Sequence, residues 1–228
     1  MSQHTSSEPV VAIVVAAGSG VRFGGDVPKT LRLLAGRPLV RWSVEALAAG
    51  GVTDVVVVVA HGLQEVYERA LAGCPVPVRL VVGGATRQES VSRGIAALPA
   101  GEIVLVHDAA RPLVPAEVVR AVADAVRIGA DAVVPVVAVS DTVRQVSGDA
   151  SAVVDRSTLR AVQTPQGFSR AALVAAHAAA AGAEFTDDAA VCEAVGYEVV
   201  LVPGSRESLK VTEPLDLAVA EAIVKERT

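Results

Sequence analysis

Residues 10–29 read VVAIVVAAGSGVRFGGDVPK, an apolar run that passes directly into a glycine-rich loop. Every side chain over 10–16 is apolar and most are β-branched, which is typical of a strand buried on both faces of a parallel sheet. Glycines after such a strand allow backbone N–H groups to turn toward a bound anion. The stretch therefore predicts a strand over Val10–Ala16 that leads into an anion-binding loop.

Outward from this stretch, runs of strand length alternate with longer helical patterns. Further strands are expected over 54–60, 78–82, 102–107, 132–139, 198–202 and 208–211. Helices are expected over 38–49, 63–71, 88–98, 116–128, 169–181, 186–195 and 214–225, with Ser169 and Thr186 as N-caps. This alternation predicts an α/β fold, a single Rossmann-like domain with a mostly parallel sheet and helices on both faces. Because ligands bind at the carboxyl ends of such strands, the loops after Ala16, Val82 and His107 are expected to be neighbours.

The pattern changes over residues 140–168, where short runs alternate apolar and polar side chains around the turn signal Gly148-Asp149. Two interpretations fit this stretch equally: a β-arm that projects from the domain and serves dimerisation, or an extra antiparallel edge of the sheet. At the other end, residues 1–9 are mostly polar, which predicts a disordered tail rather than a signal peptide.

Composition narrows the function classes. Of the 228 residues, 52% are hydrophobic and 3% aromatic, which indicates a globular chain with a core of Val, Leu, Ile and Ala. A net charge of −5 argues against a general nucleic-acid or acidic-membrane binder. No apolar run approaches the roughly 20 residues of a membrane span. The isolated Cys74 and Cys192 are expected to be inert core residues in a reducing cytoplasm.

The glycine loop carries the local positive charge of this acidic chain. Its basic residues and those just beyond it are Arg22, Lys29, Arg32, Arg37 and Arg41. A dinucleotide fingerprint would need a glycine where Phe23 stands, and a Walker A loop would need Gly-Lys-Ser/Thr where Lys29 follows Pro28. What remains is a glycine turn with one arginine inside and one lysine beyond. That combination suits a triphosphate whose leaving group is pyrophosphate.

The segment Ala16-Ala17-Gly18-x-Gly20-x-Arg22 with Pro28-Lys29 resembles the opening of the sugar and alditol nucleotidyltransferases. Later segments, in the right order from Val10 to the last helix, resemble the cytidylyltransferases of the non-mevalonate isoprenoid pathway. They are Gly83-Gly84-x-x-Arg87-x-x-Ser90-Val91, His107-Asp108-Ala109-Ala110-Arg111-Pro112, Asp141-Thr142, Asp155-Arg156, Gln163-Thr164-Pro165-Gln166, Thr186-Asp187-Asp188 and Leu209-Lys210-Val211-Thr212. Each segment is weak alone, but the ordered set is specific. The resemblance implies transfer of a cytidylyl group from CTP to 2-C-methyl-D-erythritol 4-phosphate, with Mg²⁺ or another divalent cation.

The same resemblance implies roles for individual residues. The implied catalytic set is Arg22, Lys29, Arg156 and Lys210. The implied nucleotide-binding set is Ala16, Ala17, Gly18, Gly20, Gly84, Ala85, Arg87, Ser90, Asp108 and Ala109. The implied acceptor-binding set is Thr142, Arg156, Thr164 and Lys210, with the arm reaching across a homodimer. No covalent protein nucleophile is needed, because the acceptor's phosphate oxygen can attack the α-phosphorus.

Several roles stay open at this stage. Arg87 is either a nucleotide contact or an orienting ion pair. Asp108 either contacts ribose or Mg²⁺, directly or through water, or caps the following loop. The family often carries aspartate at the position of Ala85, so base preference depends on whether that contact is made by backbone or side chain. His107 reads as a packed strand-end residue, and His177 has no evident partner.

Three other functions compete with the leading hypothesis. The first is a related nucleotidyltransferase with another acceptor, such as ribitol phosphate, or another triphosphate. The second is a nucleotide-binding regulatory module without catalysis. The third, an NAD(P)-dependent dehydrogenase, is disfavoured because Phe23 replaces a fingerprint glycine. Pyrophosphate release in the presence of an acceptor separates the first from the second, and nicotinamide binding would test the third.

Overall fold

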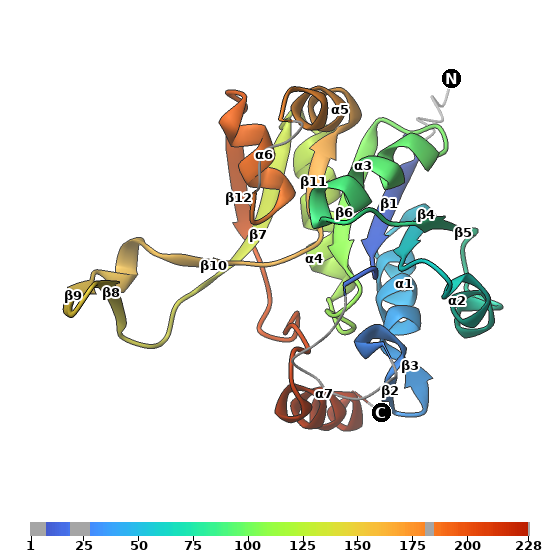
Figure 1. Ribbon diagram of the computed structural model, residues 1–228, viewed down its shortest axis with the longest axis horizontal. Coiled ribbons are helices and arrows are strands. Elements are labelled where there is room, and N and C mark those ends of the chain that lie inside the picture. The colour runs from blue at the N-terminus through green and yellow to red at the C-terminus, as the bar shows by residue number, and fades with distance from the viewer. Residues whose placement is uncertain (1–7, 19–27, 181–184, 228) are drawn as a thin grey trace, which may run out of the picture.

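The computed structural model describes residues 8–18, 28–180 and 185–227. Figure 1 shows a central twisted sheet with helices against both faces. The strand order is β10-β7-β11-β6-β1-β4-β5, and β12 also pairs with β7. The strands are β1 Val10–Val15, β4 Val52–Val59, β5 Val78–Val82, β6 Ile103–Asp108, β7 Ala132–Ala138, β10 Arg160–Val162, β11 Gln166–Ser169 and β12 Val199–Pro203. Only the pairs made by β10 and β11 are antiparallel among these strands, which confirms the predicted mostly parallel α/β fold.

The two faces of the sheet are covered by different helices. One core cluster contains side chains of α1 Leu39–Ala49, α2 Gln64–Leu71 and α4 Ala116–Arg127. The other contains side chains of α3 Arg87–Ala97, α5 Arg170–Ala179 and α6 Asp188–Ala194. A third cluster packs α7 Pro214–Glu226 against Leu34 of the small strand β2 Leu33–Leu34 and Leu39 of α1. β2 pairs with β3 Arg37–Pro38.

Strand β1 is apolar at every position because both of its faces are buried. Val10, Ala12 and Val14 belong to the first cluster, whereas Val11 and Ile13 belong to the second. Successive side chains in a strand point to opposite faces, so both sets are buried at once. Each fully buried Val or Ile contributes about 1.5–3 kcal/mol relative to an exposed one. This burial fixes the position of the loop that leaves the strand at Ala16.

The predicted arm is present but shorter than residues 140–168. Strands β8 Val143–Ser147 and β9 Ala150–Val154 form a hairpin of their own, which projects from the body in Figure 1. Beyond η3, a short 3₁₀ helix over Arg156–Thr158, the chain returns to the main sheet as β10 and β11. A projecting hairpin and an antiparallel edge are therefore both present, in different parts of the stretch, and the dimerisation role of the arm stays a prediction. Arg160–Val162 pair with β7, and Gln166–Ser169 lie in the sheet with Gly167 and Phe168 buried between β6 and β7.

Two local predictions were wrong. Residues 208–211 form no strand: Ser208 N donates to the Ser205 carbonyl at 3.1 Å, Val211 N donates to the Ala110 carbonyl at 2.8 Å, and no ladder continues from them. The N-cap of α6 is Asp187, whose side chain accepts from Ala190 N, and not Thr186. The predicted Ser169 cap of α5 is confirmed, since its side chain accepts from Ala172 N. Most of the predicted N-terminal tail, residues 1–7, lies outside the described residues.

Both cysteines are free. Cys192 is buried in the second cluster, and burial raises the pKa of its thiol to about 12, so it stays protonated and inert as predicted. Cys74 is only half-buried. No helix in the described part of the chain has the length and apolarity needed to cross a membrane.

Candidate active site

A cavity of about 560 Å³ opens at the carboxyl ends of β1, β5 and β6. The loops after Ala16, Val82 and His107 meet here, as the parallel sheet predicted. Its lining residues are Val15, Ala16, Ala17, Gly18, Lys29, Thr30, Gly84, Ala85, Thr86, Arg87, Ser90, Asp108, Ala110, Lys210 and Thr212. The structure thus brings together most of the predicted nucleotide-binding residues with Lys29 and Lys210. Arg22 and Gly20 lie outside the described residues.

One wall of the cavity is made of small residues in close contact. A Cβ placed on Gly83 would lie 2.7 Å from Ser90 Oγ and 2.8 Å from Ala17 Cβ, which is too close for any side chain. The Gly84 amide donates to Ser90 Oγ at 3.1 Å. Gly83 is therefore required for the end of β5 to approach β1 and α3. The result is a wall of backbone and short side chains beside the cavity.

The Ala85 amide has a side-chain partner that the sequence did not reveal. It donates to Glu89 Oε2 at 2.7 Å, and the Glu89 amide donates to Thr86 Oγ1 at 3.1 Å. Thr86 is thus the N-cap of α3, and Glu89 accepts from the residue before the cap rather than from the Thr86 amide of a capping box. The spacing Thr86-x-x-Glu89 signals a helix start in the sequence. Glu89 thereby holds the backbone of Ala85 beside the cavity.

Asp108 is the carboxylate at the centre of the site. Lys210 Nζ lies 2.8 Å from its Oδ2, Arg111 Nε 3.8 Å from the same oxygen, and Arg87 Nη2 4.0 Å from its Oδ1. Burial alone would raise the pKa of Asp108. The neighbouring cations, Lys210 first and Arg87 next, outweigh burial and hold the pKa below its ordinary value. Asp108 is therefore ionised, and its negative charge holds Lys210 and Arg87, which both line the cavity.

Arg87 is held from behind by a buried acid that the sequence analysis assigned only to a helix first turn. Asp188 Oδ2 lies 2.7 Å from Arg87 Nη1, and its other oxygen lies 3.1 Å from His177 Nε2. His177 Nδ1 in turn meets Ser92 Oγ at 3.1 Å. The orienting ion pair proposed for Arg87 is therefore present, and His177 does have partners. Helix pattern alone could not identify Asp188, because its environment depends on α5 packing against α6 and on Arg87 of α3 reaching its carboxylate.

Thr164 and His107 lie beneath Asp108. The Asp108 amide donates to Thr164 Oγ1 at 3.0 Å, and that hydroxyl is 3.0 Å from His107 Nδ1. His107 Nε2 faces the Arg111 carbonyl at 3.1 Å, so Nε2 carries the proton and Thr164 donates to Nδ1. Both hydrogen-bonding functions of the Thr164 hydroxyl are then used internally. The structure places Thr164 behind Asp108 and not among the lining residues.

The burial of His107 predicts a pH-dependent stability. Burial lowers its pKa from 6.5 to about 4, so between these values the unfolded chain binds the proton and the folded chain does not. The contribution of His107 to the unfolding free energy is then fully present above pH 6.5, and it is lost as the pH decreases toward 4. The loss attributable to His107 between pH 7 and pH 5 is about 2 kcal/mol.

Urea unfolding of the wild type and of His107→Asn at pH 7 and pH 5 measures this term. The variant should be less stable at pH 7 but lose about 2 kcal/mol less on acidification. His61→Gln is the control, because His61 is exposed, and it should keep the wild-type pH dependence. If the wild type and His107→Asn lost the same unfolding free energy between pH 7 and pH 5, His107 would not be the source of this pH dependence.

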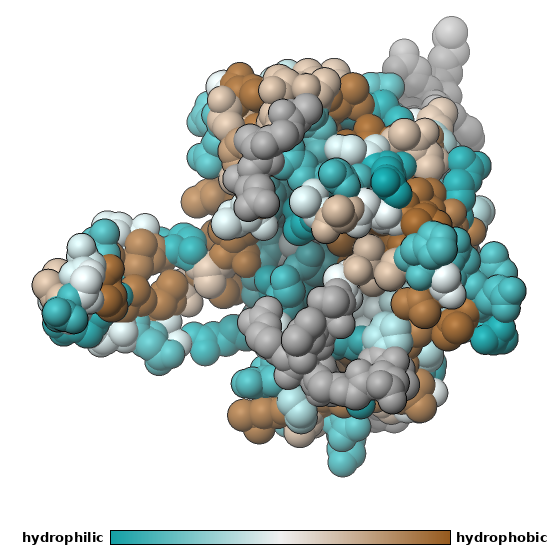
Figure 2. Space-filling view, viewed as in Figure 1, coloured by the Kyte–Doolittle hydropathy of each residue, from teal (hydrophilic) through white to brown (hydrophobic). Residues whose placement is uncertain are grey.

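The predicted arm residues lie away from this cavity. Thr142 and Arg156 are exposed and do not line it, and Arg156 Nη1 donates to the Ser140 carbonyl. Ala109 is buried, and its carbonyl accepts from Ser43 Oγ at 3.0 Å, so it supports the site from below. Figure 2 shows hydrophobic side chains on the projecting hairpin. They include Val146 and Val153, which are 71% and 61% exposed.

Among the described residues, no three His, Cys, Asp or Glu side chains gather into a metal cage. A magnesium ion bound to a nucleotide needs only one or two protein carboxylates, because phosphate oxygens and water supply the remaining ligands. Asp108 is ionised and faces the cavity, so the residues present fit that kind of site.

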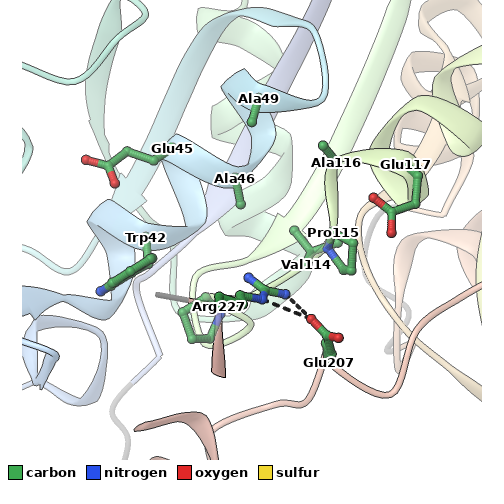
Figure 3. A pocket seen from close by; sticks show the side chains of 11 residues that line it. Trp42, Glu45, Ala46, Ala49, Val114, Pro115, Ala116, Glu117, Glu207 and Arg227 are labelled. Atoms are coloured by element: carbon green, nitrogen blue, oxygen red, sulfur yellow. Dashed lines mark hydrogen bonds and ion pairs between the residues drawn. The ribbon is translucent and has the colours of Figure 1, made fainter. Parts of the chain in front are cut away.

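A second cavity, of about 460 Å³, lies between α1, the start of α4 and the C-terminal end of α7 (Figure 3). Its polar lining consists of Glu45, Glu117, Glu207 and Arg227. The guanidinium of Arg227 is paired with Glu207. Glu45 is paired with Arg37 and Arg41, so the residues that line this cavity offer no unpaired cation to a triphosphate. The cavity beside Asp108 is therefore the candidate active site.

The cavity combines a wall of small residues, the lining residue Lys29, and a carboxylate surrounded by Lys210, Arg87 and Arg111. This set of groups at the carboxyl edge of a parallel sheet is typical of nucleotidyltransferases. The family model of 2-C-methyl-D-erythritol 4-phosphate cytidylyltransferase matches residues 10–226. The chain belongs to this family.

Individual relatives agree with the family match. A 2-C-methyl-D-erythritol 4-phosphate cytidylyltransferase of Streptomyces coelicolor is 51% identical over 231 residues, covering 95% of this chain and 85% of the relative. That of Streptomyces avermitilis is 49% identical, covering 97% and 94%. The crystal structure of the same enzyme from Thermus thermophilus superposes with a TM-score of 0.80 at 38% identity, covering 95% and 99%.

Proposed function

We propose that this chain joins the cytidylyl group of CTP to 2-C-methyl-D-erythritol 4-phosphate and releases pyrophosphate. The observation that carries the proposal is the placement of Lys29 and Lys210 on one cavity together with a wall of small residues. Family membership over residues 10–226 supports the same substrates.

The proposed reaction needs cations more than it needs acids or bases. An oxygen of the acceptor's phosphate attacks the α-phosphorus of CTP. The bond from the α-phosphorus to the oxygen that bridges the α- and β-phosphates breaks, and the electron pair of this bond leaves with pyrophosphate. The attacking oxygen is already anionic, so no proton has to be removed from it. Lys29 and Arg22 neutralise the charge that develops on the phosphates, which is where this class of transition state is stabilised.

The nucleoside is proposed to lie against the small-residue wall. Ala16, Ala17, Gly84 and Ser90 offer backbone groups and short side chains there, which leaves room for a pyrimidine ring. Arg87 acts by orienting Asp108 toward ribose or metal, because Asp188 holds its guanidinium. Main-chain recognition at Ala85 would use its carbonyl, because its N–H already donates to Glu89, a bond that fixes this backbone.

Mg²⁺, or another divalent cation, is proposed to accompany the triphosphate. Asp108 would hold it, directly or through water. When bound, such an ion neutralises phosphate charge and polarises the phosphoryl oxygens.

The acceptor is proposed to lie between Lys210 and the arm of a second copy. Arg156 of that copy and Lys210 would supply two cations for its phosphate dianion, and Thr142 of that copy would add a hydroxyl contact. Support for a homodimer comes from the hairpin itself, whose Val146 and Val153 are largely exposed in the single chain. The two free cysteines support a reducing, cytoplasmic setting.

Pyrophosphate release tests the proposal directly. Purified protein with Mg²⁺ and 2-C-methyl-D-erythritol 4-phosphate should liberate pyrophosphate with CTP far faster than with ATP, GTP or UTP. Ribitol phosphate in place of the methylerythritol phosphate is the acceptor control. Equal rates with the two acceptors would point to the broader nucleotidyltransferase reading. Nucleotide binding without release for any acceptor would support a regulatory module.

A further inference from the structure

Tyr67 is a fully buried side chain on α2 whose hydroxyl reaches the edge of the active-site cavity. Its oxygen lies 2.5 Å from Thr30 Oγ1 and 3.3 Å from the Ala16 carbonyl oxygen. A carbonyl only accepts, so Tyr67 donates to Ala16 and Thr30 donates to Tyr67. One hydroxyl thus joins two residues that both line the cavity, although Tyr67 does not line it.

These two residues stand at opposite ends of the glycine loop. Ala16 is where β1 ends, and Thr30 lies in η2 Lys29–Leu31, the 3₁₀ turn that begins with Lys29. The turn closes on itself through bonds from Leu31 N to Pro28 O and from Arg32 N to Lys29 O. Fixing Thr30 to Ala16 therefore fixes the backbone of Lys29 relative to β1.

A phenylalanine would fill the same place in the core, so packing does not account for the hydroxyl. Placing a hydroxyl in an apolar core is unfavourable unless it is hydrogen-bonded, and here it is bonded on both sides. Burial raises the pKa of Tyr67, which keeps the hydroxyl protonated and able to donate to Ala16.

We propose that Tyr67 is a positioning residue for Lys29: its hydroxyl clamps the Lys29 turn to the end of β1 and so sets where the ammonium meets the phosphates. The proposal rests on the cytidylyltransferase function proposed above. Electrostatic stabilisation of a transition state depends on donors being placed in advance, and a displacement of about 1 Å can cost on the order of 10²-fold in rate.

Tyr67→Phe removes only the clamp oxygen. We expect kcat for pyrophosphate release to fall about 10-fold, while the KM for CTP changes by less than about twofold, because the ground-state wall stays in place. Tyr197→Phe is the matched control, since Tyr197 packs against the second core cluster on the other face of the sheet. It should keep the wild-type kcat.

Two further variants separate positioning from a general loss of structure. Thr30→Val removes the other half of the clamp and should lower kcat by a similar factor, and the double variant should be no worse than either single one. In a Lys29→Ala background, Tyr67→Phe should cause no further loss, because the residue that it positions is already absent.

A wild-type kcat in Tyr67→Phe would contradict the clamp. So would a fall in kcat on adding Tyr67→Phe to Lys29→Ala that is as large as the fall that Tyr67→Phe causes alone. A rise in the KM for CTP with unchanged kcat would also overturn it, because that result assigns the hydroxyl to binding. Failure of the wild type to release pyrophosphate would instead reject the proposed function, so the two failures are distinguishable.

Discussion

Lys29→Ala is expected to lower kcat by roughly 10²–10³-fold while the KM for CTP changes by less than about threefold. CTP in its ground state is still held through its nucleoside by the backbone and small residues of the wall, so its binding depends little on one ammonium. The charge that passes to pyrophosphate appears only as the bond breaks, and that charge is what Lys29 is proposed to stabilise. Steady-state kinetics with a coupled pyrophosphate assay measure both constants.

The matched control is Lys225→Ala, because Lys225 is an exposed lysine in the last turn of α7. It should leave both constants unchanged. If Lys29→Ala raised the KM for CTP as strongly as it lowered kcat/KM, Lys29 would be a ground-state binding residue. An unaffected rate would remove Lys29 from the chemistry altogether.

Arg156→Ala is expected to raise the KM for the acceptor by about 10- to 100-fold, since a hydrogen bond to a charged group is worth roughly 1.5–3 kcal/mol. CTP binding should be unchanged, because Arg156 does not line the nucleotide cavity of its own chain. Initial rates over a range of acceptor concentrations test this. Arg144→Ala is the control, as Arg144 lies on the same hairpin and bonds to Ser151 within it.

Mixing two defective variants tests whether the arm acts on a second copy. Arg156→Ala and Lys210→Ala are each expected to be impaired at low acceptor concentration. After random exchange of subunits, about a quarter of all sites would combine an intact Lys210 with an intact Arg156 from the other chain. Recovery of activity on mixing supports the shared site. A mixture that is no more active than its components would mean that the arm serves its own subunit.

The main sheet was predictable because its strands are encoded as local runs. Val10–Ala16 and Val78–Val82 needed only apolar, β-branched composition, and α1 and α4 needed only helical spacing. The meeting of Ala16, Gly84 and Asp108 followed from the parallel sheet alone, because its strand ends share one edge. Lys29 and Lys210 were named from resemblance, and both line the same cavity.

What the sequence analysis missed depends on packing between distant segments. Asp188 looks like an ordinary first-turn acid until α6 places it against Arg87 and His177. Thr164 looks like a free hydroxyl until β11 enters the sheet and brings it under Asp108. Tyr67 looks like a core aromatic, and only coordinates show its hydroxyl at Thr30. Local patterns report composition and period, and none of these contacts is local.

The place of β11 between β6 and β7 has a consequence for how the chain folds as it is synthesised. The half-sheet β5-β4-β1-β6 is complete in sequence by residue 108, and it can assemble while the ribosome is still working. Every described strand that pairs with β7, namely β10, β11 and β12, is translated after it. β7 therefore emerges before any of its partner strands, and both of its edges stay unpaired until they are synthesised. The two halves of the sheet thus form at different times during translation.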